Sequence, residues 1–163
     1  MKIGVVSDTH NNLKNIETII NLFNDKEVSV VVHTGDIANA KSLEKFSKLN
    51  SELIGVYGNN DRNELNIKET ALKNKFYFKE PPNLLSFSYR QIAVFHEPDP
   101  IEEFLLQNKK VDVVLHGHTH RYRNETKNGI LYFNPGESAG MLKGSNAVGI
   151  VDLDTLEAKR IFF

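Results

Sequence analysis

The chain has 163 residues, 40% hydrophobic and 25% charged, a composition that predicts one globular domain, 1–163, with a sizeable core. Its formal net charge of −1 argues against a polycationic protein that binds long nucleic acid or membranes. The absence of cysteine excludes disulfides, thiolate metal ligands and a cysteine nucleophile. Met1 leads directly into a strand pattern rather than a signal peptide, and no run approaches the roughly 20 apolar residues of a membrane span. A cytoplasmic protein is therefore expected.

The first third of the chain alternates apolar runs with helical patterns. Apolar runs predict three strands, at 3–7, 28–32 and 53–56. Apolar residues at helical spacing predict a helix between each pair of strands, the first capped by Asn11 or Asn12. This order indicates a parallel sheet with right-handed crossovers. In such sheets ligands gather at the carboxyl ends of strands, so the polar residues that follow the three runs are expected on one rim: Asp8, His10, Asp36 and Asn59.

The rest of the chain contains more strands than helices. The pattern predicts a modest helix at 64–73, a turn at Pro81-Pro82, and a short helix after Pro100 with a solvated end at Lys109-Lys110. Further strands are predicted at 84–89, 92–95, 111–115, 129–133, 147–153 and 156–162. The first two are joined near Arg90-Gln91, and the last two form a hairpin. The surplus of strands predicts a second, mixed sheet packed on the first, with helices on the two outer faces.

The stretch 115–120 carries three of the six histidines. On an extended backbone the rings of His116, His118 and His120 would point to one side, because strand side chains alternate between the two faces. Imidazole is a common ligand of zinc and other first-row transition metals. We therefore expect this stretch to hold part of a metal site.

The candidate ligands are carboxylate, imidazole and carboxamide groups: Asp8, His10, Asp36, Asn59, His96, His118 and His120. A set without sulfur suits manganese, iron, zinc or nickel better than copper(I). Seven ligands are too many for one catalytic ion that keeps an open position. They suit two divalent ions, with manganese as the first choice, that share a bridging carboxylate. Two ions roughly 3.5–4 Å apart can clamp an in-line displacement at phosphorus and lower the pKa of a bound water.

Five short motifs, in this order, resemble the five blocks of the calcineurin-like metallophosphoesterases: Asp8-Thr9-His10, Gly35-Asp36, Gly58-Asn59-Asn60-Asp61, His96 and Gly117-His118-Thr119-His120. Their order and spacing resemble those of the small single-domain YfcE-type phosphodiesterases of bacteria and archaea, and segment 134–138 is similar to a late loop of that subgroup. Taken singly, Asp8 suits a helix cap and 59–61 suits a turn. The full set on successive strand ends carries the resemblance.

The resemblance implies a four-layer αββα sandwich of two mixed β-sheets flanked by helices. It implies that Asp36 bridges two ions and that each ion takes three further ligands: Asp8, His10 and His120 for the first, and Asn59, His96 and His118 for the second. A bridging hydroxide would attack the phosphoester, while the metals and Asn59 stabilise the charge on the phosphorus oxygens. Asp61 is expected to orient His10 or a neighbouring ligand. Two histidines fall on no ligand position and are interpreted as structural or supporting: His33 and His116.

Two departures from the family pattern concern catalysis. Asn60 stands where many relatives carry a histidine that is thought to protonate the leaving oxygen or orient the phosphate, and an amide cannot act as a general acid at neutral pH. Diesters with good leaving groups are therefore expected to be better substrates than alkyl monoesters. The fourth block commonly reads His-Gly-His, but here it reads His96-Glu97-Pro98, and a carboxylate at Glu97 would repel phosphate.

The predicted function is metal-dependent hydrolysis of phosphodiester bonds by direct hydroxide attack. The expected substrate is a small phosphodiester. Membranes and long nucleic acids are not expected as partners, and the small chain leaves surface for a homodimer. Two alternatives stay open. One is a non-catalytic binding scaffold, the use that a retromer subunit similar to this family makes of the fold. The other is a nuclease or cyclic-nucleotide phosphodiesterase acting on short or cyclic substrates.

Overall fold

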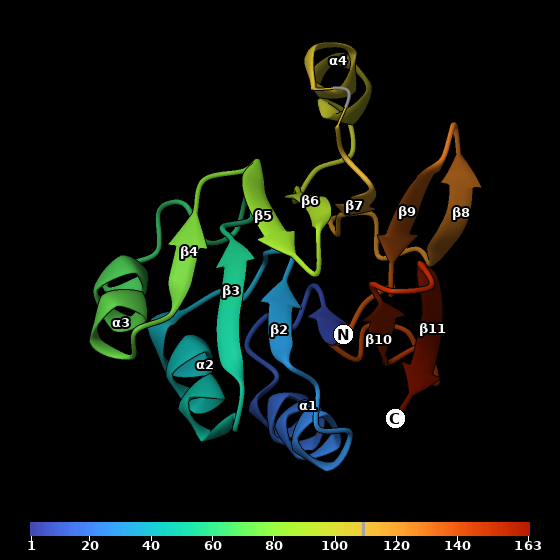
Figure 1. Cartoon of the computed structure of the whole chain (residues 1–163). Helices are drawn as coiled ribbons and strands as arrows, with labels where there is room; N and C mark the ends of the chain where they lie inside the picture. Colours follow the sequence, from blue (N-terminus) through green and yellow to red (C-terminus); the bar gives the residue numbers. More distant parts are fainter. Residues whose placement is uncertain (109) are drawn as a thin grey trace.

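The computed structural model describes residues 1–108 and 110–163, so Lys109, half of the predicted solvated helix end, lies outside the described residues. Two β-sheets lie against each other, with helices on their outer faces (Figure 1). No helix among the described residues combines the length and the apolar character that crossing a bilayer would need.

The first sheet has six strands. In spatial order they are β11 (Glu157–Phe162), β10 (Ala147–Asp152), β1 (Lys2–Val6), β2 (Val30–His33), β3 (Glu52–Val56) and β4 (Tyr77–Lys79). The strands β1 to β4 pair in parallel, as predicted for the first three, whereas β10 runs antiparallel to both of its neighbours. The hairpin predicted at the end of the chain is therefore the antiparallel edge of an otherwise parallel sheet.

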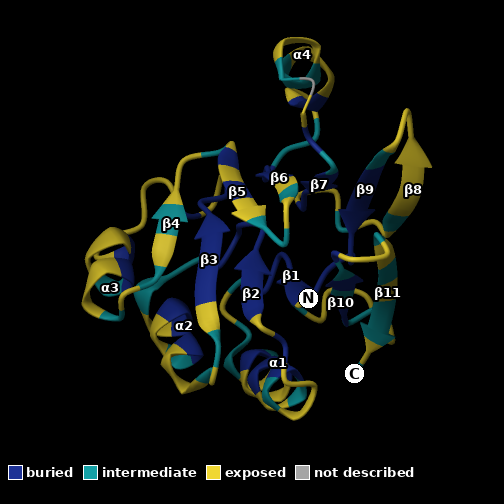
Figure 2. Cartoon of the chain, in the orientation of Figure 1, coloured by how far each residue is buried: buried dark blue, intermediate teal, exposed yellow. Residues whose placement is uncertain are grey.

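The second sheet has five strands and is also mixed. In spatial order they are β5 (Asn83–Phe87), β6 (Arg90–Val94), β7 (Val113–Leu115), β9 (Ile130–Asn134) and β8 (Arg123–Lys127). The three central strands β6, β7 and β9 are parallel, and the two edge strands pair antiparallel. In both sheets the central strands are buried, whereas β8 is exposed along almost its whole length (Figure 2).

Helices form the two outer layers. The helices α1 (Leu13–Asp25), α2 (Ala40–Lys45) and α3 (Ile67–Lys73), with a 3₁₀ turn at Phe46–Lys48, pack on the first sheet, and α4 (Ile101–Gln107) packs on the second. Asn12 caps α1, as predicted, by accepting a hydrogen bond from the backbone of Asn15. A third apolar cluster fills the space between the sheets. The four-layer αββα sandwich of two mixed sheets flanked by helices is therefore confirmed.

Three local predictions were wrong. The edge strands β4 and β8 were not predicted, because β4 is only three residues long and β8 reads Arg-Asn-Glu-Thr-Lys, a charged sequence that suits an exposed edge and lacks an apolar alternation. The turn between β5 and β6 lies at Ser88-Tyr89, with φ of 46° and 63°, and not at Arg90-Gln91, where β6 has already begun. Helix α3 begins at Ile67 rather than at 64.

Candidate metal centre

The predicted ligands all follow the carboxyl ends of strands and converge where the two sheets meet. Backbone hydrogen bonds fasten these strand ends to one another. Asp8 N donates to Gly35 O at 3.1 Å, and His10 N donates to Asp36 O at 2.8 Å, so the loops after β1 and β2 lie together. Gly117 N donates to the carbonyl of His96 at 3.1 Å, which joins the loops after β6 and β7. The rim that the sequence predicted therefore includes strand ends of both sheets.

Two groups of side chains at this rim are compact enough to hold a cation. One group consists of Asp8, His10 and His120, and the other consists of Asp8, Asp36 and His96. In each group the ligand atoms lie within 4.8 Å of one another. Asp8 Oδ1 lies 3.4 Å from His120 Nε2, and Asp36 Oδ1 lies 3.3 Å from His96 Nε2. The two groups share Asp8, so they form adjoining parts of one centre.

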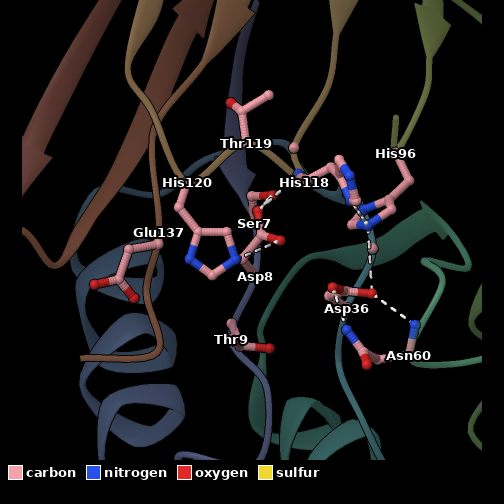
Figure 3. A network of polar contacts seen from close by, with 12 residues as sticks. Ser7, Asp8, Thr9, Asp36, Asn60, His96, His118, Thr119, His120 and Glu137 are labelled. Carbon is pink, nitrogen blue, oxygen red and sulfur yellow. Dashed lines mark hydrogen bonds and ion pairs between the residues drawn. The ribbon is translucent and has the colours of Figure 1, made fainter. Parts of the chain in front are cut away.

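Asn59 and His118 extend the second group. Asn59 Oδ1 lies 2.9 Å from His96 Nε2 and 3.1 Å from His118 Nδ1, and the two imidazole nitrogens are 3.3 Å apart. Figure 3 shows these two rings side by side over Asp36, with His120 beside Asp8. The other ring nitrogen of His96, Nδ1, donates to the carbonyl of Thr34 at 2.9 Å, so Nε2 is the ring nitrogen that faces the cluster.

Unsatisfied polar atoms test whether this centre suits a cation. Among the described residues, Asp8 Oδ1 and His10 Nε2 are buried and have no hydrogen-bond partner. A buried carboxylate oxygen without a partner is costly, and buried polar atoms are almost always satisfied. Together with the nitrogen and oxygen atoms around them, these atoms form a donor set that fits a first-row divalent ion.

The backbone is strained at most of the predicted ligands. Five of the seven adopt a left-handed conformation: Asp8 (φ 50°), His10 (φ 44°), Asp36 (φ 59°), His118 (φ 65°) and His120 (φ 56°). Such a conformation costs a non-glycine residue roughly 1–3 kcal/mol and persists only where the surroundings enforce it. It also shows why the extended backbone predicted for 116–120 was wrong, because β7 ends at Leu115 and a tight loop carries both histidines.

The carboxylate of Asp61 enforces the conformation of one ligand loop. Asp61 is fully buried, and its two oxygens accept hydrogen bonds of 2.7–2.8 Å from four backbone N–H groups: those of Asp36, Ile37, Ala38 and Gly58. The prediction that Asp61 orients a neighbouring ligand therefore fits Asp36, whereas no hydrogen bond joins Asp61 to His10 among the described residues. Both oxygens are therefore occupied by the backbone.

Asn60 contacts Asp36 with both its backbone and its side chain. Its backbone N–H donates to Asp36 Oδ1 at 3.0 Å, and its side-chain Nδ2 donates to Asp36 Oδ2 at 2.7 Å. Burial acts to raise the pKa of Asp36, but the hydrogen bonds and charge of His96 together with the donors of Asn60 outweigh it and hold the pKa well below its usual range. Asp36 is therefore a carboxylate at neutral pH.

The two histidines outside the predicted ligand set are buried supports. His33 Nδ1 accepts from the backbone N–H of Gly35 at 3.1 Å, so its Nε2 carries the proton and donates to the hydroxyl of Thr9 at 3.0 Å. Burial lowers the pKa of His33 to about 3 and that of His116 to about 4, so both rings are neutral. His33 therefore anchors Thr9, the residue between Asp8 and His10.

Asn134 is the supporting residue that sequence reasoning did not single out, although segment 134–138 contributed to the family resemblance. It is fully buried at the end of β9, and its Nδ2 lies 3.1 Å from Gly117 O and 3.2 Å from Thr119 Oγ1. Its Oδ1 accepts from Gly136 N at 2.8 Å. These contacts hold the loop that carries His118 and His120.

Gly117 lets that loop approach the end of β1. A Cβ at this position would collide with the hydroxyl of Ser7 and would lie 2.9 Å from Asp8 Oδ2. That same Asp8 oxygen accepts hydrogen bonds from Ser7 Oγ and from the backbone N–H of His118 at 3.1 Å. Glycine is therefore needed for close packing of the two loops.

The centre is buried on one side and open on the other. Asp8, Asp36 and His96 are buried, whereas Asn59, Asn60 and His118 are exposed. A substrate would therefore approach over the exposed residues. The carboxylate of Glu97, expected to repel phosphate, is paired with Arg62, whose Nη2 lies 3.0 and 3.1 Å from its two oxygens.

Known proteins resemble this chain in sequence and in fold over nearly their whole length. The phosphodiesterase MJ0936 of Methanocaldococcus jannaschii is 35% identical over 164 residues, covering 99% of this chain and 98% of that protein. The phosphodiesterase YfcE of Escherichia coli K12 is 28% identical over 171 residues, covering 96% and 90%. The solved structure of an archaeal phosphodiesterase superposes with a TM-score of 0.91 at 32% identity and covers both chains completely.

A more distant solved structure is that of Vps29 from Entamoeba histolytica, with a TM-score of 0.70 at 15% identity, covering 100% of this chain and 99% of that one. At that identity only the fold is shared. The model of the calcineurin-like phosphoesterase superfamily domain, by contrast, matches residues 1–156. With this match and the close relatives, the chain belongs to the calcineurin-like phosphoesterase superfamily.

Proposed function

We propose that this protein is a phosphodiesterase that uses two divalent metal ions, manganese being the first choice. The observation that carries the proposal is the convergence of five oxygen and nitrogen donors in two adjoining groups, extended by Asn59 and His118, with buried donor atoms left unsatisfied. The names of MJ0936 and YfcE as phosphodiesterases support the reaction class. The proposed ligands are those that the resemblance implied: Asp8, His10 and His120 for one ion, Asn59, His96 and His118 for the other, and Asp36 for both.

The free lone pairs support Asp36 as the bridge. Each carboxylate oxygen can accept about two hydrogen bonds or metal bonds. Asp8 Oδ2 already accepts from Ser7 and from the backbone of His118, which leaves Oδ1 alone for a cation. Asn60 donates once to each oxygen of Asp36, so each oxygen keeps a lone pair for a cation if His96 Nε2, 3.3 Å from Oδ1, binds a metal in place of Asp36. Asp36 can thus bind one cation through each of its two oxygens, whereas Asp8 has only Oδ1 free.

The residues of this chain bind and orient in the proposed reaction. Divalent ions held here would supply Lewis-acid chemistry, because they lower the pKa of water and offset negative charge on phosphorus oxygens. Asn59 and Asn60 present carboxamides at the open side of the centre, where a phosphodiester would approach. Neither amide can protonate a leaving alkoxide at neutral pH. The preferred substrates are therefore diesters whose leaving group departs without a general acid.

The decisive experiment measures metal content and turnover on one preparation. We expect about two Mn²⁺ per chain after loading, and hydrolysis of bis-p-nitrophenyl phosphate well above that of an alkyl monoester such as glycerol phosphate. Removal of metal with a chelator should abolish turnover, and Mn²⁺ or Ni²⁺ should restore it. Metal content below one ion per chain, or no turnover with any metal, would favour the binding scaffold over the enzyme.

Removing the carboxamide of Asn134 is expected to weaken metal binding without direct contact with a metal. Asn134→Ala frees the loop that carries His118 and His120, and loss of such support around metal ligands typically lowers metal affinity by about 10–100-fold. Titration calorimetry with Mn²⁺ on the apo-protein measures this change. Asn83→Ala is the matched control, because Asn83 is also fully buried and its side chain donates, within residues 1–108 and 110–163, only to Gly55 O, at 3.2 Å. Equal affinities in the two variants would contradict the role of Asn134.

A further inference from the structure

An ion pair that the proposed mechanism does not use lies beside the open side of the centre. Arg62 and Glu97 are far apart in the sequence, yet each directly follows part of the metal centre: Arg62 follows the Asn59–Asp61 turn, and Glu97 follows His96. Asn59 Oδ1 and His96 Nε2 are 2.9 Å apart, so the two segments meet at the proposed second metal position. The pair therefore borders the face over which a phosphodiester would approach.

Buried contacts fix the backbone position of Arg62. The preceding residue is the fully buried Asp61, whose carboxylate ties this turn to the loop of Asp36. Backbone hydrogen bonds of 3.1 Å from Asp61 N to Gly58 O and from Glu64 N to Asp61 O close the turn on both sides of Arg62. The position of the Arg62 backbone relative to the metal centre is thus set by buried contacts, and Glu97 then fixes the direction of its side chain.

Glu97 contacts only one nitrogen of the Arg62 guanidinium. Both of its oxygens contact a single nitrogen, Nη2 of Arg62, at 3.0 and 3.1 Å. Among the described residues, Nε and Nη1 of Arg62 have no hydrogen-bond partner, and the side chain is 45% exposed. A guanidinium carries five N–H donors in a planar fork that matches phosphate oxygens, so donors remain for an anion in solution.

We propose that Arg62, oriented by Glu97, binds a second anionic group of the substrate. The preferred substrates would then be phosphodiesters that carry a further phosphate group outside the scissile bond. This inference rests on the proposed phosphodiesterase function and narrows its substrate class. In this proposal Glu97 holds the side chain of Arg62 in place. A held arginine loses less conformational freedom when the anion binds, and its guanidinium cannot turn toward the metal ligands. Arg62 is a specificity residue and Glu97 a positioning residue.

Two substrates that differ only in the second anion test the proposal. They are thymidine 5′-(p-nitrophenyl phosphate) and the same diester with a 3′-phosphate, both assayed with the Mn²⁺-loaded protein. We expect a higher kcat/KM for the 3′-phosphorylated substrate and a fall of about tenfold in that preference in Arg62→Ala, the loss expected for a hydrogen bond to a charged group. The change should appear in KM, because a remote group binds the ground state and the transition state alike.

The double variant Arg62→Ala/Glu97→Gln separates recognition from charge cancellation. If Arg62 merely neutralises Glu97, removal of both charges restores the wild-type preference, and that result would overturn the proposal. If Arg62 binds the second anion, the double variant lacks the preference as Arg62→Ala does. Lys127→Ala is the control, because it breaks a more exposed ion pair, Lys127–Glu102 at 3.2 Å, between β8 and α4, and should keep the preference.

Binding of thymidine 3′,5′-bisphosphate provides a readout that does not depend on turnover. Its dissociation constant, measured by titration calorimetry with the Mn²⁺-loaded protein and compared with that of thymidine 5′-monophosphate, should show the same preference in the wild type and lose it in Arg62→Ala. Rising salt should reduce the preference as well, because the pair is exposed and screened. Failure of both diesters to turn over would count against the phosphodiesterase itself, whereas turnover with equal kcat/KM and equal dissociation constants would count only against Arg62.

Discussion

Asp36→Asn is expected to lower kcat/KM on a phosphodiester by about 10³-fold or more, since it removes the group proposed to bind both ions. An amide has one oxygen in place of two, and its NH₂ group would face either Nδ2 of Asn60 or a cation, both of which repel it. Metal content should fall from two ions to about one. Steady-state kinetics and metal analysis of the same preparation measure the two effects together.

Asp112→Asn is the matched control for this substitution. Asp112 is a more exposed carboxylate that likewise has defined partners, since it pairs with Arg90 at 3.3 Å and accepts from Gln91 N at 2.8 Å, but it lies before β7, away from the metal centre. We expect it to affect stability and leave metal content unchanged. Full activity in Asp36→Asn, with two ions still bound, would remove Asp36 as the bridge and leave Asp8 as the residue common to both groups.

Asp61→Ala is expected to lower the free energy of unfolding by about 3–5 kcal/mol, a large part of the stability of a domain of this size. The substitution leaves four buried backbone N–H groups without their acceptor, each of which would cost about 1–3 kcal/mol if water could not reach it. Urea unfolding in the presence of a chelator measures the effect without a contribution from bound metal.

Asp61→Asn should have an intermediate effect, because the amide keeps one oxygen for two of the N–H groups and turns its NH₂ group toward the others. Asp99→Ala, at an exposed position, should change the unfolding free energy by less than about 0.5 kcal/mol. A loss in Asp61→Ala as small as that of Asp99→Ala would mean that the loop of Asp36 keeps its conformation without the buried carboxylate.

Much of the fold could be predicted because its central strands are apolar on both faces. The runs that became β1, β2 and β3 are bounded by polar turns, and that pattern identifies parallel strands regardless of context. The edge strands could not be predicted in the same way. β8 consists of charged and polar residues that favour no strand by themselves, and it is extended because it pairs with β9.

The candidate site was predictable as a set of residues and only partly as a geometry. The polar residues after β1, β2 and β3 were expected to meet, since carboxyl ends of parallel strands share a rim, and the family resemblance implied that those after β6 and β7 would join them. The expected extended stretch at 116–120 was wrong because tertiary hydrogen bonds from Asn134 and packing against Ser7 hold a tight, left-handed loop there. No local pattern encodes such a conformation, which is unfavourable in isolation.

Glu97 also shows the difference between what a local sequence pattern predicts and what tertiary contacts decide. By itself the residue predicted repulsion of phosphate, and the structure places the opposite charge of Arg62 against its carboxylate. The sequence alone determined the family, the layered α/β fold and the residue types at the strand ends, because hydrophobic periodicity and motif order are local properties. Only the tertiary structure decided the left-handed ligand loops, the buried clamps Asp61 and Asn134 and the Arg62–Glu97 pair, because these depend on contacts between residues that are distant along the chain.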